Sequence, residues 1–62
     1  MTDVKGKWAI ARDDSSGRSV YYDETRDCFT GHPHRASTWH YKIEAETFAA
    51  FMRLTDVTVR EI

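Results

Sequence analysis

The chain has 62 residues and a formal net charge of −1, with 9 Lys and Arg against 10 Asp and Glu. A domain of this length buries only about 60% of the surface of its unfolded chain, so we expect one domain, residues 1–62, with a small core. The balanced charge argues against a dedicated nucleic-acid binder, because phosphate neutralisation supplies much of the affinity of such proteins.

The single cysteine, Cys28, excludes an internal disulfide, which suits a reducing compartment. The opening MTDVKGKWAI lacks the apolar run of a signal peptide. No stretch of the sequence approaches the ~20 apolar residues that are needed to span a bilayer. We therefore expect a cytoplasmic protein with no membrane partner.

The first predicted element is a β-hairpin formed by residues 6–12 and 18–23. Trp8 and Ile10 are two positions apart, which is the period of a half-buried strand. The segment DDSSG, residues 13–17, has the composition of a turn, because Asp and Ser bond to nearby backbone and Gly adopts positive φ easily. The segment RSVYY then resumes with residues that favour strands.

A long connection without a sustained period runs from Glu24 to His40. Pro33 excludes an ordinary central strand or helix interior there. A connection of this length is uncommon in a compact domain unless it is functional or is held by its own side chains. We expect Phe29, Ala36 and Trp39 to hold it against the core.

The segment YKIEAETFAAFMRL, residues 41–54, predicts a helix. Ala45, Phe48, Ala49 and Met52 fall at i, i+3, i+4 and i+7, which is one helical stripe. No Ser, Thr, Asp or Asn precedes the segment directly, so the sequence defines the first residue of the helix only to within a few positions.

The closing segment DVTVREI alternates apolar and polar residues, which is typical of a strand. The sequence thus predicts an α+β fold of order ββαβ, a three-stranded antiparallel or mixed sheet with one helix on one face. The expected core consists of Trp8, Ile10, Val20, Tyr22, Val57 and Val59 from the strands, and Ala45, Phe48 and Met52 from the helix. The opposite sheet face is expected to be uncovered and to carry Ala9, Ala11, Tyr21, Thr58 and Arg60.

A set of packing and turn residues extends over nearly the whole chain. It comprises Trp8, Gly17, Tyr21 and Tyr22, FTGHP at residues 29–33, Ala36, Trp39, Ala45, Phe48, and VTV at residues 57–59. This set resembles small uncharacterised ββαβ proteins of bacteriophages and bacterial mobile elements, in which an aromatic-Thr-x-x-Pro loop precedes an Ala-containing helix. The resemblance implies the fold and a phage or prophage origin, and it carries no catalytic motif. The chain departs from the pattern at Tyr41 and Lys42, where such proteins often place a Ser or Thr helix cap.

The first half of the chain is also similar to a WW domain, through Trp8, the paired Tyr21 and Tyr22, and Pro33. We reject this similarity for three reasons. The span between Tyr22 and Pro33 looks too short for a third strand. Phe29 stands where the ligand-binding Trp would be, and the C-terminal helix has no place in that fold.

Four side chains have the chemistry of metal ligands: Cys28, His32, His34 and His40. Zinc accepts thiolate and imidazole ligands in tetrahedral geometry. However, the spacing C-x3-H-x-H-x5-H is not that of a standard zinc finger, because a second cysteine is missing. We expect a solvated loop and no cofactor, and keep a zinc-stabilised mini-domain as an alternative.

Enzymatic activity is not expected. The carboxylates of the turns could do acid–base work only in a pocket that separates their pKa values. Ligand pockets typically occupy ~300–1,000 Å³, for which so short a chain offers little room. The sequence also lacks a phosphate-binding glycine loop and any nucleophile motif.

Tyr and Arg on a flat sheet face are residues that protein–protein hot spots favour. We therefore expect a partner-binding surface around Tyr21 and Arg60, extended by the loop from Phe29 to His34. Phe51 lies off the main helical stripe and adds a second exposed position. The candidate partner-binding residues are Tyr21, Phe29, His32, His34, Phe51 and Arg60.

The leading hypothesis is a small non-enzymatic protein-binding module that is encoded by a phage or prophage. It would act in the host cytoplasm as an inhibitor or modulator of a host protein complex, in transcription or in anti-phage defence such as CRISPR. The chain itself is expected to be a monomer or a weak homodimer. The alternative is a nucleic-acid-associated accessory protein, in which Tyr21 stacks on a base beside Arg18 and Arg60.

Overall fold

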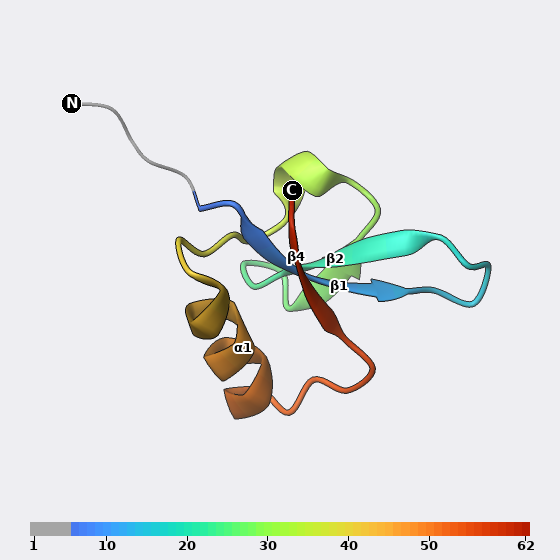
Figure 1. Cartoon of the computed structure of the whole chain (residues 1–62). Helices are drawn as coiled ribbons and strands as arrows, with labels where there is room; N and C mark the ends of the chain where they lie inside the picture. Colours follow the sequence, from blue (N-terminus) through green and yellow to red (C-terminus); the bar gives the residue numbers. More distant parts are fainter. Residues whose placement is uncertain (1–5) are drawn as a thin grey trace.

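The computed structural model describes residues 6–62 as an antiparallel sheet with one α-helix (Figure 1). The elements in chain order are β1 (Trp8–Asp13), β2 (Ser19–Asp23), β3 (Cys28–Thr30), the short 3-10 helix η1 (Pro33–Arg35), α1 (Lys42–Phe51) and β4 (Thr58–Glu61). The sheet is four-stranded, in the order β3-β2-β1-β4. The fold is therefore α+β as predicted, but its order is βββαβ. None of the helices formed by residues 6–62 has the length and apolar character that crossing a bilayer requires.

The expectation of three strands is wrong, because the long connection contains β3. The register of β3 with β2 is Tyr21↔Thr30, Tyr22↔Phe29 and Asp23↔Cys28. The turn between these strands is tight, since the Asp23 carboxylate accepts the Thr25 N–H at 3.0 Å and Asp27 takes a φ of 52°. Asp tolerates this left-handed conformation better than most residues. The span between Tyr22 and Pro33 is thus long enough for a third strand, which removes one reason for rejecting a WW-like fold.

The rest of the connection is held by backbone hydrogen bonds. The Trp8 N–H donates to the Trp39 carbonyl at 3.1 Å, and the Trp39 N–H donates to the Trp8 carbonyl at 2.8 Å. The Ser37 N–H donates to the Tyr22 carbonyl at 3.0 Å. The connection therefore contacts both strands of the hairpin. Gly6 lies so close that a Cβ atom there would be 2.1 Å from the Trp39 carbonyl carbon.

The core lies between α1 and one face of the sheet. Ile10 is fully buried and packs with Tyr22, Ala45 and Ala49. Partly buried side chains surround this cluster: Trp8, Phe29, Trp39, Phe48, Leu54, Val57 and Val59. Most of the predicted core is thereby confirmed, including Trp39 and Phe29 from the connection. Ala36, the third residue expected to hold the connection, is half-buried and lies outside this cluster.

Two residues of the predicted core lie outside this cluster, Val20 and Met52. Val20 is half-buried and pairs with Arg12, near the hairpin turn. Met52 is 38% exposed and forms the C-cap of the helix, which ends at Phe51 rather than at residue 54. The end of α1 is a Schellman motif. In this motif the two residues after the C-cap donate their backbone N–H groups to carbonyls of the last helical turn.

The residue in the left-handed position of this motif is Arg53, with a φ of 57°. Its N–H donates to the Ala50 carbonyl at 3.1 Å, and the Leu54 N–H donates to the Ala49 carbonyl at 2.9 Å. Leu54 then joins the core cluster. At the other end of α1, the Glu44 carboxylate accepts the Tyr41 N–H at 3.3 Å, which compensates for the missing cap.

The sheet face away from α1 is less open than predicted. Ala9 and Ala11 are only 0% and 2% exposed. Their larger neighbours shield them, because Ala9 pairs with Arg60 and Ala11 pairs with Tyr21. η1 lies across the sheet from α1 and contacts β2 (Figure 1). The expectation that both alanines are uncovered is therefore wrong.

Candidate functional site

Two large apolar side chains on the outer side of α1 are strongly exposed, as is Tyr41 at the N-cap of the helix, which is 67% exposed. Phe51 is 81% exposed and Ile43 is 66% exposed. Together with Trp39, Thr47 and Phe48, they line an open, shallow hollow of about 470 Å³. We call these five residues the α1 patch.

The helical phase of α1 explains why the patch faces outward. Residues four apart lie on one side of a helix, so Ile43, Thr47 and Phe51 form a row. Ala45 and Ala49 form the opposite row and are buried against the sheet. Ile43 and Phe51 consequently have no core to enter.

The inner edge of the α1 patch is fixed by aromatic packing. The ring centroids of Trp39 and Phe48 are 5.0 Å apart, and those of Phe48 and Tyr22 are 5.8 Å apart. Because Tyr22 belongs to the buried cluster, the patch is continuous with the core. A rigid aromatic base of this kind suits a binding surface, since little side-chain freedom is lost on association.

Two opposite charges lie near the two ends of α1. Glu44 lines the hollow near the start of α1, and Arg53 follows the end of the helix. Within residues 6–62 the ion pairs are Lys7–Glu61 at 3.6 Å and Arg26–Asp23 at 4.0 Å. In that part of the chain, neither Glu44 nor Arg53 is neutralised by an ion pair.

The predicted pair Tyr21 and Arg60 lies on the other side of the molecule. Both residues are on the sheet face away from α1, as expected, but β1 separates their strands. The Arg60 guanidinium reaches across β1 and donates to the Ser19 hydroxyl at 3.5 Å. Tyr21 is half-buried and Arg60 is exposed. The pair is therefore a polar, partly shielded surface rather than an apolar one.

Phe29 does not share a face with Tyr21. Its ring packs edge-on against Tyr22, with centroids 5.4 Å apart, and the Arg12 guanidinium lies 4.0 Å from its centroid. Phe29 thus belongs to the core side of the sheet. His32 and His34 are exposed, with ring centroids 5.5 Å apart. The six candidate partner-binding residues therefore fall into separate groups.

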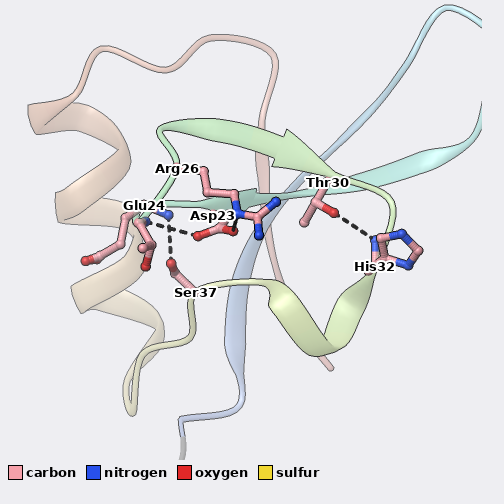
Figure 2. Close-up of polar contacts among 7 residues, drawn as sticks. Asp23, Glu24, Arg26, Thr30, His32 and Ser37 are labelled. Carbon is pink, nitrogen blue, oxygen red and sulfur yellow. Dashed lines mark hydrogen bonds and ion pairs between the residues drawn. The ribbon is translucent and has the colours of Figure 1, made fainter.

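The candidate metal ligands are only partly brought together. His32 and His34 are neighbours, and the His32 backbone N–H donates to the Thr30 hydroxyl at 3.2 Å (Figure 2). Cys28 is exposed on β3 and His40 precedes α1. Across residues 6–62, no three His, Cys, Asp or Glu side chains gather closely enough to hold a metal ion.

In the two turns, Asp carboxylates accept hydrogen bonds from backbone N–H groups of the same turn. Asp23, the buried charged residue of the described chain, accepts the Thr25 N–H and lies near Arg26, while the Glu24 N–H donates to the Ser37 hydroxyl at 2.8 Å (Figure 2). In the hairpin turn, Asp14 accepts hydrogen bonds from the Ser16 side chain and from two backbone N–H groups. These bonds lower the pKa of Asp14 below its ordinary value. Both arrangements stabilise turns.

The sequence identified Phe51 as exposed but missed Ile43. The same argument applies to both, because Ile43 is also off the buried stripe and eight positions before Phe51. The helical pattern alone does not reveal how far Trp39 and the connection before it extend over α1.

No known protein family, curated protein or solved structure matches this chain significantly. The resemblance to phage and mobile-element proteins, and the origin that it implies, therefore stay predictions.

Proposed function

We propose that this protein is a small non-enzymatic protein-binding module that docks on another protein through the α1 patch. The observation that carries the proposal is the exposure of Phe51 and Ile43 on a rigid helix, at 81% and 66%. Burying a side chain of this size on association contributes roughly 1.5–3 kcal/mol. Exposed aromatic and aliphatic groups beside a fixed aromatic base are typical of interface hot spots.

The chemistry of the patch favours a protein target over a nucleic acid. Single-strand binders interleave aromatic side chains with Lys and Arg that follow the phosphates. Here the charged residue that lines the hollow is Glu44, which would repel phosphate. The proposed target remains a host protein complex of transcription or defence, as expected for a phage-encoded modulator. Tyr21 and Arg60 then form a second, polar contact surface.

Affinity capture from a lysate of the cell that makes the protein tests this proposal. We expect Phe51→Ala to reduce recovery of the target at least about tenfold, the loss of about 1.4 kcal/mol. Ile62→Ala is the matched control, because Ile62 is 48% exposed and lies outside the patch. Both variants should keep the melting temperature of the wild type. Equal recovery by both variants would show that the α1 patch is not the docking surface.

The same experiment distinguishes the nucleic-acid alternative. Binding through phosphates falls steeply with salt, by about 10³–10⁵ between 50 and 200 mM for a protein with several phosphate contacts. A target held by the α1 patch should survive that change, because apolar contacts are not screened. Recovery that disappears in 200 mM salt, or after nuclease treatment, would favour the accessory-protein function.

A further inference from the structure

We infer that the α1 patch binds a second copy of this chain, with the two α1 helices packed antiparallel across a two-fold axis. The inference rests on the proposed function, because it names what docks on the patch. A two-fold dimer requires a surface that complements itself, so that residue i meets residue j and residue j meets residue i. The apolar row of α1 has this property, and the opposite charges near the two ends of α1 favour one orientation of the pair.

The apolar row of α1 is spaced symmetrically about Thr47. Ile43 and Phe51 lie four residues before and four residues after Thr47. In an antiparallel pair centred on Thr47, each Ile43 therefore meets Phe51 of the second copy. Thr47 and the exposed Ala50 are small, so the axes can approach to the 8–10 Å that packed helices adopt.

The charges select the antiparallel orientation. Glu44 lies near the start of α1 and Arg53 just beyond its end, and each lacks an ion-pair partner among residues 6–62. In an antiparallel pair centred on Thr47, Glu44 of each chain faces Ala50 of the other, about 4.5 Å along the axis before Arg53, an offset that a long Arg side chain can span. A parallel pair would place Glu44 beside Glu44 and Arg53 beside Arg53, which is unfavourable. The helix dipoles also oppose each other favourably only in the antiparallel pair.

The size of the surface indicates a weak dimer. A standard stable interface buries about 800 Å² per partner. That is about a sixth of the 4729 Å² that the described structure exposes, and more than one side of the 10-residue α1 offers. We therefore expect a dissociation constant between about 10 µM and 1 mM, and a dimer that a tighter-binding target displaces.

Sedimentation equilibrium over this concentration range tests the inference. The wild type should shift from monomer to dimer, and Ile43→Glu should raise the dissociation constant at least about tenfold. Ile62→Glu makes the same change at an exposed position outside the patch and should alter the constant less than about twofold. Ile43 is exposed in the first turn of α1, where a negative charge suits the helix dipole, so the variant should stay folded.

A charge exchange tests the orientation. Glu44→Arg alone and Arg53→Glu alone should each be monomeric, because each homodimer would then face like charges at both ends. Glu44→Arg also loses the hydrogen bond from the Tyr41 N–H, so Glu44→Gln, which keeps an acceptor oxygen there, is the control for that loss and should dimerise more tightly than Glu44→Arg. An equimolar mixture of the two variants should form a heterodimer, in which every Arg meets a Glu. A mixture that stays monomeric while the wild type dimerises would overturn the antiparallel arrangement.

The results also separate this inference from the proposed function. A wild type that remains monomeric at 1 mM, or a dimer that persists in Ile43→Glu, overturns the second copy as the occupant. If Phe51→Ala nevertheless loses a captured target, the α1 patch still binds a protein and the proposed function stands. If neither the dimer nor the captured target responds to changes in the patch, both are wrong.

Discussion

A hydrogen bond from the Tyr22 hydroxyl to the Asp27 carboxylate ties the β2–β3 turn to the core. Ionising this hydroxyl would break the hydrogen bond and leave a partly buried phenolate beside a carboxylate, and these effects together raise the pKa of Tyr22 from 10.0 to about 12. A pKa that is higher in the folded state than in the unfolded state stabilises the fold fully below the unfolded value. That stabilisation is lost as the pH rises through the folded value.

We therefore expect the wild type to lose stability between about pH 10 and pH 12, and Tyr22→Phe to lack this part of the pH dependence. At neutral pH, Tyr22→Phe should lower the free energy of unfolding by about 1.5–3 kcal/mol, because Asp27 loses a donor. Tyr21→Phe is the matched control and should change it by less than about 0.5 kcal/mol. Urea unfolding at several pH values measures both effects. A Tyr22→Phe protein as stable as the wild type would mean that the bond contributes nothing.

At the scale of the elements, the hairpin was predicted correctly because its turn is encoded locally. The Asp14 carboxylate accepts the N–H groups of Ser16 and Arg18, and Gly17 has a φ of 85°. These preferences are visible in DDSSG. β3 was missed because its turn depends on Asp27 in a left-handed conformation, which sequence composition does not reveal. For the same reason the sequence did not reveal that α1 ends early, because Arg53 after the helix also takes a left-handed conformation.

The connection between η1 and α1 depends on one close approach of the backbone. Gly6→Ala would place a Cβ atom against the Trp39 backbone, where no flexible side chain can move away. We expect the change to cost at least about 1–3 kcal/mol and to weaken the pairing of Trp8 with Trp39. Gly31→Ala is the matched control, because nothing lies within 4 Å of the added atom.

Thermal unfolding measures the difference between these two variants. For a domain of this size, each kcal/mol shifts the midpoint by about 4–8 °C. Equal midpoints for Gly6→Ala and Gly31→Ala would contradict the close packing of this connection. The approach itself could not be predicted from the sequence, because it joins the segment before β1 to a residue more than thirty positions later.

At the scale of the whole molecule, the small core leaves little reserve of stability. Proteins are typically stable by about 0.05–0.15 kcal/mol per residue, which for this chain is roughly 3–9 kcal/mol. Only Ile10, among the large side chains of the described residues, is fully buried, and most of the other large apolar groups are shared between core and surface. Some residues of α1 therefore stabilise the fold, while their neighbours on the same helix are available for binding.

Phe48 and Phe51 separate these two roles, since they lie one turn apart on α1. Phe48 packs against Trp39 and Tyr22, whereas Phe51 is 81% exposed. Phe48→Ala should cost about 3 kcal/mol, the lower end of the range for Phe, because the ring is half-buried. Phe51→Ala should change the free energy of unfolding by less than about 0.5 kcal/mol, although it removes the same atoms.

Denaturant unfolding and sedimentation of both variants, at matched concentrations, test this separation. Phe51→Ala should unfold like the wild type at low concentration and yet fail to associate, because it removes the contact with Ile43 of the second copy. Phe48→Ala should unfold at much lower denaturant, since a loss of about 3 kcal/mol is a large share of the total. If Phe51→Ala is as destabilised as Phe48→Ala, then its side chain is buried in solution. The outer side of α1 would in that case be part of the core, and not a surface available for docking.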